Sequence, residues 1–333
     1  MRAVVLVGGF GTRLRPLTND LPKQMLPVVR VPMIERVVAA LGSYGVTEAV
    51  LSLGYRPDAF LDAYPDGVCA GVVLHYAVEP DPLDTAGAVR FAALSAGIDD
   101  TFIVVNGDVL TDLNVAELWE FHKSHGAEGT IALTPVEDPS RYGVVPIDDN
   151  GRVIEFVEKP APGTAPTNWI NAGTYVLEPS VLDRIASDRK VSIERVTFPA
   201  MVADESLFAL HSDAYWIDAG TPDTYLRAQL DLIDGIRANE IAVLPSDKID
   251  SSALVENSVL GANVVIGNGT IVRNSILMDG VTIGPGVRIH DSIIASGARV
   301  GPDSHISDLT VVGAGVEVPA QSELTGARLP ESD

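Results

Sequence analysis

The sequence predicts two kinds of fold in one chain of 333 residues: a doubly wound α/β domain with a mostly parallel, mixed sheet, followed by a left-handed parallel β-helix of hexapeptide repeats. Strand-like and helix-like segments alternate through the first two thirds of the chain, which is typical of a sheet with helices on both faces. The remainder repeats at a regular spacing. We expect domains at 1–236 and 249–329, with a linker at 237–248.

The first domain is expected to alternate its elements in a regular order. Apolar runs predict strands at 3–7, 48–53 and 101–105, and helical periodicity predicts helices at 32–45, 85–97 and 114–126. Asp84 or Thr85 is expected to cap the second of these helices. Asn150-Gly151 separates two alternating runs, which is typical of an antiparallel hairpin, so the sheet is expected to be mixed.

The C-terminal repeats superpose at a period of 17 residues, with copies that begin at Glu256, Arg273 and His290. A weaker fourth copy begins at Ser307. Inside each copy an apolar residue recurs every five or six positions, and a small residue follows many of them. This pattern predicts three short strands per coil, stacked so that the apolar residues line the interior.

Composition excludes several classes of function. The formal net charge of −22 disfavours binding to nucleic acid or to an anionic membrane. No run of eighteen apolar residues occurs, and Cys69 is the only cysteine, so an internal disulfide or a cysteine-based zinc site is excluded. We expect a cytoplasmic protein, in which any anionic substrate needs a local basic site.

The stretch "VGGFGTRLRPLTNDLPKQML" offers such a site. Gly8, Gly9 and Gly11 follow a predicted strand, and Arg13 and Lys23 follow the glycines. Glycines at the end of a strand let backbone N–H groups approach an anion, and the basic side chains add charge, so we expect a nucleoside triphosphate to bind here. Neither a complete G-x-G-x-x-G motif nor a Walker motif is present. A structural glycine turn remains an alternative.

Two carboxylates follow apolar runs further along the chain. Asp108 comes just after the predicted strand at 101–105, at the edge where open α/β sheets bind ligands, and Asp218 precedes Gly220. Each could instead be an ordinary turn residue. As a pair they suit Mg²⁺, which binds one or two protein carboxylates together with phosphate oxygens.

Six motifs occur in an order that resembles the sugar-1-phosphate nucleotidyltransferases. They are "GGFGTRLRPLT…PK", "DTAG", "NGD", "EKP", "NAG" and "WIDAGTP". The likeness covers nearly the whole chain and is greatest to the mannose-1-phosphate guanylyltransferases, which often carry a C-terminal β-helix. The resemblance implies a Rossmann-like domain that transfers a nucleotidyl group from an NTP to a sugar 1-phosphate and releases pyrophosphate.

The resemblance also implies roles for individual residues. It implies that Arg13, Lys23 and Asp108 are catalytic and that Asp108 and Asp218 bind Mg²⁺. Nucleotide binding falls on Gly8, Gly9, Gly11, Thr12, Arg13, Pro82, Asp84 and Gly87. Sugar-phosphate binding falls on Gly143, Glu158, Lys159 and Asn171. Because the attacking phosphate oxygen is already anionic, catalysis needs positioning and charge stabilisation but no general base.

Two departures from the family pattern bear on the substrate. Gln24 replaces the usual proline after the lysine, and Asp84 stands where the family has glycine. The resemblance places this loop near the base, where a carboxylate could accept hydrogen bonds from guanine, so GTP is favoured. The favoured sugar, mannose 1-phosphate, is implied by the resemblance alone. The alternatives are dTTP, UTP or ATP with glucose 1-phosphate or a cyclitol phosphate.

A rival function of another class is a hexapeptide-repeat acyltransferase with His290 or His305 as base. A further expectation concerns assembly: the end coils of the β-helix leave strand edges uncovered, so we expect a homo-oligomer with contacts through this domain.

Overall fold

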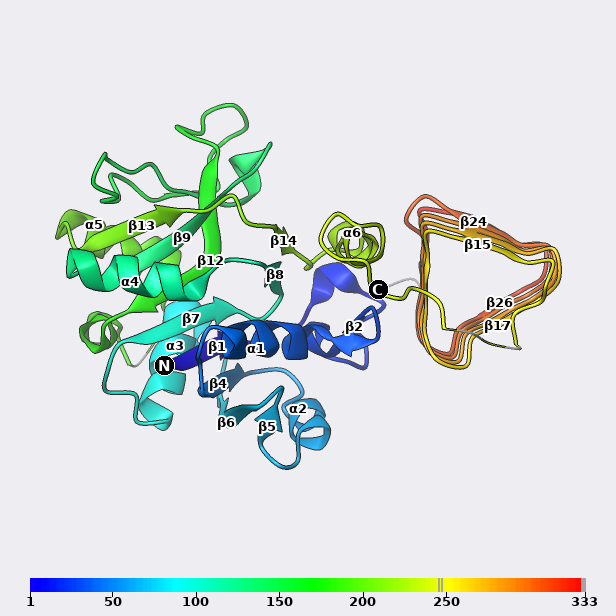
Figure 1. The fold of residues 1–333 in the computed structure, drawn as a ribbon, viewed down its shortest axis with the longest axis horizontal. Helices are drawn as coiled ribbons and strands as arrows, with labels where there is room; N and C mark the ends of the chain where they lie inside the picture. Colours follow the sequence, from blue (N-terminus) through cyan, green and yellow to red (C-terminus); the bar gives the residue numbers. More distant parts are fainter. Residues whose placement is uncertain (188, 245, 247, 331–333) are drawn as a thin grey trace. The chain divides into compact units, whose positions relative to one another are not determined.

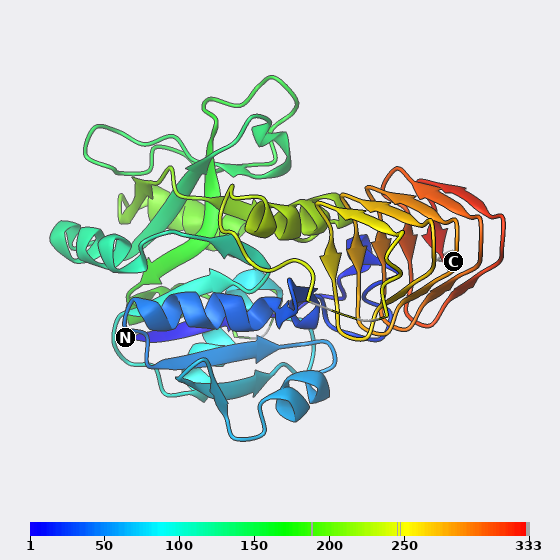
Figure 2. The ribbon, with the colours of Figure 1, turned by 45° about the vertical axis from the view of Figure 1, so that its right-hand side comes forward.

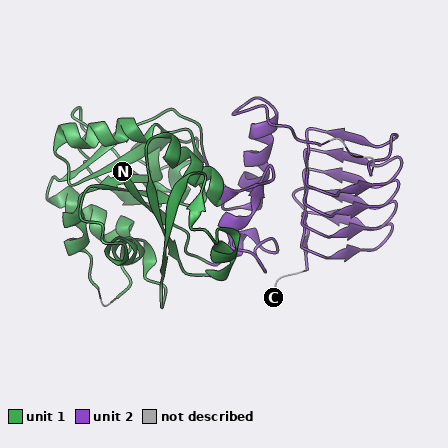
Figure 3. Cartoon of the chain, turned by 60° about the horizontal axis from the view of Figure 1, so that its bottom comes forward, with its two compact units in different colours: residues 1–9, 34–216 green, residues 10–33, 217–333 purple. Residues whose placement is uncertain are grey.

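A computed structural model describes residues 1–187, 189–244, 246 and 248–330. The chain divides into two units: Met1–Gly9 with Ile34–Trp216, and Phe10–Met33 with Ile217–Asp333 (Figure 3). The predicted fold class is confirmed in both. The boundaries expected at 236 and 249 stay a prediction, because the second unit also takes residues 10–33 from the N-terminal region. Two positions of the expected linker, Pro245 and Asp247, lie outside the described residues.

The first unit is built on a ten-stranded mixed sheet. Its main path runs β11-β10-β12-β7-β1-β4-β6-β5, and β9 joins β12 to β13. β1 pairs in parallel with β4 and β7, and β4 with β6, whereas β12 pairs antiparallel with β7 and β9. The carboxyl ends of β1, β4, β6 and β7 therefore meet at one edge of the sheet.

The strands of this unit are β1 Arg2–Leu6, β4 Glu48–Leu53, β5 Val68–Cys69, β6 Val72–Val78, β7 Phe102–Asn106, β8 Val109–Thr111, β9 Gly129–Pro135, β10 Gly143–Val144, β11 Val157–Glu158, β12 Trp169–Leu177 and β13 Leu207–His211. Its helices are α1 Met33–Ser43, α2 Asp58–Ala63, α3 Asp84–Ser95, α4 Val115–His125 and α5 Phe198–Ala203, and α1 begins on the last residue of the second unit's N-terminal segment.

Local sequence explains where these helices begin and end. The Asn114 side chain accepts hydrogen bonds from the N–H groups of Ala116 and Glu117, which caps α4. Gly126 ends the same helix in the left-handed conformation that glycine adopts readily. The hairpin expected at Asn150-Gly151 is present as a tight turn, with Ile147 and Val153 bridged antiparallel across it.

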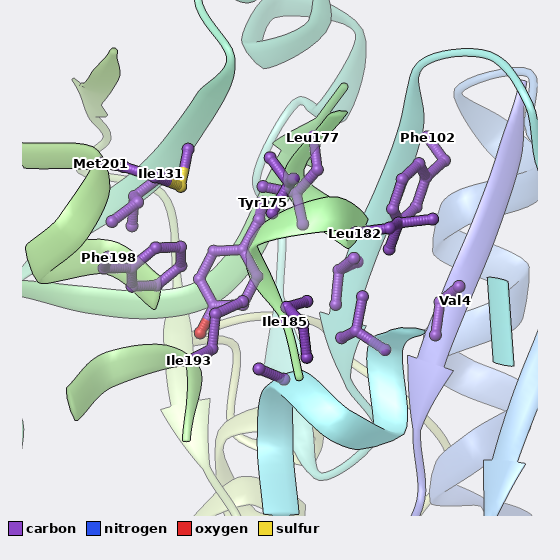
Figure 4. Packing of buried hydrophobic residues seen from close by; sticks show 14 of the residues in the cluster. Val4, Phe102, Ile131, Tyr175, Leu177, Leu182, Ile185, Ile193, Phe198 and Met201 are labelled. Atoms are coloured by element: carbon purple, nitrogen blue, oxygen red, sulfur yellow. The ribbon is translucent and has the colours of Figure 1, made fainter. Parts of the chain in front are cut away.

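Apolar side chains from the sheet and its helices form the core of this unit. Figure 4 shows Tyr175 of β12 beside Phe198 of α5, and their rings meet edge to face at 5.1 Å. Val4 and Phe102, from adjacent regions of β1 and β7, are fully buried in the same cluster. These contacts hold the central strands in register. The packed strands in turn fix the starting points of the loops at their carboxyl ends.

The second unit combines residues 10–33, helix α6 and the repeat domain. Short 3₁₀ turns form at Thr12–Leu14 and Lys23–Met25, and a hairpin joins β2 Pro27–Val28 to β3 Val31–Pro32. Helix α6 spans Pro222–Ile233 after a Thr221–Thr224 capping box. The preceding strand β14 spans Trp216–Asp218.

The repeat domain is a β-helix of three parallel sheets, seen end-on in Figure 1 and obliquely in Figure 2. One sheet holds β15 Leu254–Glu256, β18 Ile271–Arg273, β21 Arg288–His290, β24 His305–Ser307 and β27 Glu323–Thr325. The next holds β16 Val259–Leu260, β19 Ile276–Leu277, β22 Ile293–Ile294, β25 Val311–Val312 and β28 Arg328–Leu329. The third holds β17 Val265–Ile266, β20 Thr282–Ile283, β23 Arg299–Val300 and β26 Glu317–Val318.

The coils repeat at the spacing read from the sequence. Val255 pairs with Val272 and Val272 with Ile289, 17 residues apart each time, and the apolar side chains of these coils fill the interior. The fourth copy is weaker for a visible reason: Asp308 and Leu309 are both left-handed at the corner where earlier coils have one such residue. An extra residue is thus accommodated there. Among the described residues, no helix is long and apolar enough to cross a membrane.

Candidate active site

The "NGD" motif is held tightly against the end of β1. Asn106 is the last residue of β7 and pairs with Leu6, and the Gly107 N–H donates to the Leu6 carbonyl at 2.9 Å. A Cβ atom at Gly107 would lie 2.7 Å from a Val7 side-chain carbon, so only glycine fits there. Asp108 follows directly, and the turn places its backbone at the ligand-binding edge of the sheet.

The "NAG" motif packs on the same turn. Gly173 has φ +74°, and a Cβ atom there would lie 2.5 Å from the Asn106 amide nitrogen. The Asn171 side chain accepts from the Gly173 N–H and donates to the Tyr175 hydroxyl, both at 2.9 Å. These bonds hold an irregularity in β12 between Asn171 and Tyr175. The two motifs therefore form one rigid corner of the first unit.

A cavity of about 290 Å³ lies beside this corner, at the ends of β1 and β6. Its lining residues include Gly8, Gly9, Glu79, Pro82 and Asp84. Gly9 has φ +98°, and a Cβ built on it would meet no atom within 4 Å among the described residues of the first unit. Gly8 and Gly9 are both exposed, and a Cβ atom at Gly8 would lie 3.8 Å from Glu79 Oε1.

The two cavity carboxylates are held differently. Glu79 Oε1 accepts from the Ser52 hydroxyl at 3.0 Å, and Glu79 Oε2 accepts from the Leu83 N–H at 3.1 Å. Asp84 is exposed, and its Oδ1 accepts from the N–H of the next residue, Thr85, at 2.8 Å. Glu79 thus holds the loop 79–83 in shape, whereas Asp84 presents charge to the cavity wall.

The expectation that Asp84 or Thr85 caps α3 was wrong. Leu83 occupies the N-cap position without a side-chain bond, and Asp84 begins the helix with φ +63°. The Thr85 hydroxyl is used elsewhere, since it donates to Glu194 Oε2 at 2.8 Å and accepts from the Ile193 N–H at the same distance. An aspartate therefore occupies a backbone conformation that favours glycine.

Three of the four residues expected to bind the sugar phosphate come together on neighbouring strands. Gly143 of β10 pairs with Glu158 of β11, and Lys159 Nζ lies 3.2 Å from Glu158 Oε1. A Cβ atom at Gly143 would lie 2.6 Å from the Phe156 ring. Asn171 lies nearby, because its neighbour on β12, Ile170, pairs with Val144.

In the second unit, residues 10–33 form a compact loop, called the signature loop below. Gly11 has φ +59°, and its carbonyl accepts from the Thr18 hydroxyl at 2.8 Å. A Cβ atom at Gly11 would lie 3.3 Å from Lys23 Cβ, so Lys23 packs directly against the glycine turn. Thr12 and Arg13 are exposed on the 3₁₀ turn that follows.

Arg13 lies next to Asp218 in this unit. Its Nη2 is 4.0 Å from Asp218 Oδ2, and Asp218 Oδ1 accepts from the Gly220 N–H at 2.9 Å. A Cβ atom at Gly220 would lie 2.8 Å from Arg13 Nη2, so the glycine of "WIDAGTP" lets the guanidinium approach. A cation and a carboxylate side by side suit a phosphate that carries a bound metal ion.

The expected site residues thus fall into two groups. The first unit holds Gly8, Gly9, Pro82, Asp84, Gly87, Asp108, Gly143, Glu158, Lys159 and Asn171. The second unit holds Gly11, Thr12, Arg13, Lys23 and Asp218. Gly87 is buried in α3, and a Cβ atom there would lie 2.8 Å from Leu83, so it shapes the loop rather than lining the cavity.

Comparison with known proteins tests the resemblance directly. A protein-family model described as "Nucleotidyl transferase" matches residues 2–235, and a model described as "GMPPB C-terminal domain" matches residues 225–330. The chain belongs to the nucleotidyl transferase family. The resemblance inferred from the six motifs is confirmed, as is the enzyme class.

Relatives of this nucleotidyltransferase carry the same activity in their names. A mannose-1-phosphate guanyltransferase of Hypocrea jecorina is 47% identical over 68% of this chain and 62% of its own length, so the chain spans less than two thirds of that relative. A mannose-1-phosphate guanylyltransferase of Mycobacterium tuberculosis is 38% identical over 80% of this chain and 77% of its own. The crystal structure of HddC from Yersinia pseudotuberculosis complexed with GMP-PN has a TM-score of 0.58 at 31% identity, over 68% of this chain and 97% of that one.

The sequence did not single out every residue at the cavity of this nucleotidyltransferase. Glu79 lines the cavity, and it follows β6 directly, at the same edge of the sheet as Asp108. A related signal, a carboxylate just after a largely apolar run, was therefore present for Glu79 as well. Ser52, which bonds Glu79, carried no such signal because it lies inside a strand.

The histidines of the rival function lie on the surface of the coils. His305 Nδ1 is 3.3 Å from Glu323 Oε1 on the adjacent coil, and its side chain is half exposed. His290 ends β21, where it is partly buried. An exposed pair of this kind is a common feature of a solvated strand face, and no observation favours an acyltransferase site here.

Proposed function

We propose that the chain transfers a guanylyl group from GTP to a sugar 1-phosphate, with mannose 1-phosphate favoured, and releases pyrophosphate. The observation that carries this proposal is the match to named mannose-1-phosphate guanylyltransferases, which extends over 80% of the chain in the Mycobacterium tuberculosis case. The cavity in the first unit supports it, since carboxylates at the wall suit a base with adjacent N–H donors, as guanine has.

The chain's own residues would divide the work by charge. The N–H groups of Gly8, Gly9 and Gly11 and the guanidinium of Arg13 would bind the β- and γ-phosphates of the nucleotide. Lys23 would stabilise the charge that develops near the α-phosphate during in-line attack. Lys159 would hold the phosphate of the sugar phosphate and Glu158 its hydroxyls, so that the attacking oxygen is positioned before reaction.

A divalent metal fits the donor set, and we propose Mg²⁺. Enzymes of this family generally use a divalent metal. No group of three or more Asp, Glu, His or Cys side chains gathers for a metal in the part of the chain that the structure describes. Asp108 and Asp218 would therefore bind the ion together with phosphate oxygens, as Mg²⁺ prefers. When bound, the ion would neutralise the triphosphate.

Substrate choice is tested by a matrix of nucleotides and sugar phosphates. GTP, ATP, UTP and dTTP are each combined with mannose 1-phosphate, glucose 1-phosphate and a cyclitol phosphate, and pyrophosphate release is measured with Mg²⁺ present. We expect the highest kcat/KM for GTP with mannose 1-phosphate. A higher value for another pair would keep the reaction and change the substrates. An assay of acetyl-CoA turnover serves as the control for the rival class, and we expect none.

We also propose that the chain acts in the cytoplasm as a homo-oligomer with contacts through the β-helix. Leu254 and Val265, on the first coil, keep more than a third of their surface exposed, and β15 is the end strand of its sheet. Light scattering on the full chain tests the assembly, and a monomeric mass would contradict it. The variants Leu254→Glu and Val265→Glu should lower the mass if this coil makes the contact.

A further inference from the structure

We propose that Arg30 is a positioning residue that ties the signature loop to the first coil of the β-helix, so that the repeat domain helps to place Arg13 and Lys23. Neither the sequence motifs nor the proposed mechanism gives Arg30 a role. The kinetic part of the test rests on the proposed function, whereas the structural part does not.

The guanidinium of Arg30 donates to three backbone carbonyls of the C-terminal region. Nη1 bonds the carbonyls of Ala242 at 3.2 Å and Leu260 at 3.4 Å, and Nη2 bonds the carbonyl of Ile241. Leu260 belongs to β16 of the first coil, and its N–H donates to the Ala242 carbonyl at 3.1 Å. The guanidinium of Arg30 therefore bonds two backbone segments, one at Ile241 and Ala242 and the other at Leu260, which are also bonded to each other. The planar guanidinium, with several donors in fixed directions, suits such a contact.

The turn that carries Arg30 is strained. Val29 and Arg30 form the two-residue loop between β2 and β3, with φ of 44° and 70°. Such turns prefer Asn-Gly because both central residues need positive φ, and a β-branched valine is poorly suited to that region. Tertiary contacts must hold the turn in place. The Val29 N–H donates to Gln229 Oε1 of α6 at 3.0 Å, and the Val29 side chain is 2% exposed.

The strained turn is coupled to Lys23 by short backbone links. The Leu26 N–H donates to the Lys23 carbonyl at 3.1 Å, and the Met33 N–H, beyond the hairpin, donates to the Leu26 carbonyl at 3.0 Å. Lys23 in turn packs against Gly11, two residues before Arg13. A shift of the hairpin would therefore move both basic residues that the proposed mechanism assigns to phosphate.

A second contact joins the same loop to a later coil. A Cβ atom at Gly313 would lie 3.2 Å from Pro16 Cβ, so the glycine lets the loop approach the repeat domain there as well. The signature loop is thus held at two points, Pro16 and Arg30, that lie on either side of Lys23. Such a two-point attachment restrains a loop whose exposed residues would otherwise move freely.

Hydrogen–deuterium exchange of residues 10–26 tests the attachment in the full-length protein. In Arg30→Met we expect exchange in this segment to quicken by about tenfold or more, because the bonded state no longer predominates. Arg273→Met is the matched control, since Arg273 is paired with Glu256 on the β-helix surface. Its exchange in residues 10–26 should equal that of the wild type. Equal exchange in Arg30→Met would overturn the proposal, and thermal unfolding checks that each variant is folded.

Kinetics and a double variant separate attachment from turn shape. In Arg30→Met, kcat should fall by about tenfold or more while KM for the sugar phosphate stays within about twofold, because the sugar-phosphate residues belong to the first unit. Val29→Asn/Arg30→Gly supplies the preferred turn without the guanidinium, and should remain slow and rapidly exchanging. Recovery of wild-type behaviour in it would show that Arg30 only shapes the turn. A wild type without pyrophosphate release would defeat the proposed function, and the exchange result would still decide the attachment.

Discussion

Arg13 Nη2 and Asp218 Oδ2 lie 4.0 Å apart in the second unit, a cation expected to bind phosphate beside a carboxylate expected to bind metal. The Arg13 side chain is 57% exposed, so this pair contributes little to folding stability. We propose that the two side chains are arranged to share a ligand. The Gly220 N–H holds the other carboxylate oxygen of Asp218, so the side chain is oriented before any ligand arrives.

Replacing either expected metal carboxylate should stop turnover without unfolding the chain. In Asp108→Asn and Asp218→Asn we expect kcat to fall by about 100-fold or more, on the order of 3 kcal/mol in the barrier, because an amide binds a divalent cation poorly. Pyrophosphate release over a series of Mg²⁺ concentrations measures this. A chelator should abolish wild-type activity. Near-normal activity of both variants at ordinary Mg²⁺ would defeat the two-carboxylate assignment.

The two lysines should differ in which kinetic constant they change. Lys23→Ala should lower kcat, because its charge meets the transition state, whereas Lys159→Ala should mainly raise KM for the sugar phosphate, which is charged before and after attack. Steady-state kinetics at saturating nucleotide separates the two. Interchanged effects would show that the assigned roles are reversed.

Sequence reasoning reached most of the fold because the decisive signals are local. Asn114 and Gly126 mark the two ends of α4 in the sequence and in the structure. Residues that pair between β18 and β21 are 17 positions apart, and each strand of the β-helix points an apolar side chain inward. The repeat is therefore visible in the sequence as a regular apolar pattern.

Contacts between distant residues could not be predicted in the same way. The Val29 N–H bonds a side chain 200 positions away, and nothing near Arg30 in the sequence distinguishes it from a solvated arginine. The same applies to Asp84, which has a left-handed backbone and directly follows the loop 79–83 that Glu79 bonds. The contacts of the Val29–Arg30 turn and the conformation of Asp84 both depend on packing between distant parts of the chain. A pattern in a single sequence does not reveal such packing.

The buried amide of Gln24 should be a site of easy stabilisation. Its side chain is 1% exposed, and neither Nε2 nor Oε1 has a hydrogen-bond partner within the described structure. Gln24→Met keeps the volume and removes two unsatisfied polar atoms, so the free energy of unfolding should rise by about 1–2 kcal/mol. Denaturant unfolding measures it, and Gln24→Ala is the control that should lose stability through a cavity. A destabilised Gln24→Met would mean that the amide has a partner such as water.

His122 should make stability depend on pH in the mildly acid range. Burial lowers the pKa of His122 below its ordinary value, although the nearby Glu178 carboxylate opposes this. A group whose pKa is lower in the folded state binds fewer protons there, so stability is complete above the unfolded pKa of about 6.5 and falls as the pH drops below it. The neutral ring bonds Thr130 at 2.9 Å and Glu178 at 3.2 Å.

Urea unfolding between pH 7.5 and pH 5.5 checks this, compared with His122→Gln. The glutamine variant should be less stable at neutral pH, because it loses the packed ring, but its stability should change less across the interval. The unrelated carboxylates titrate mostly below this range, so they affect both proteins alike. Parallel pH profiles would show that another group is responsible.

Asp84 should influence both stability and the choice of base, in opposite directions. Glycine adopts φ +63° without the penalty that an aspartate incurs, so Asp84→Gly should raise the free energy of unfolding by about 1 kcal/mol. The same change removes the exposed carboxylate from the cavity wall. If that carboxylate accepts from guanine N–H groups, kcat/KM for GTP should fall by about tenfold relative to ATP.

Asp84→Asn separates the two effects, since it keeps the size and tolerates the left-handed backbone but loses the charge. We expect it to match the wild type in stability and Asp84→Gly in its loss of preference for GTP. Competition between GTP and ATP in one pyrophosphate-release assay, with product identified by mass, measures the preference directly. An unchanged preference in both variants, together with higher stability of Asp84→Gly, would show that Asp84 only begins α3 and that Glu79 or the backbone selects the base.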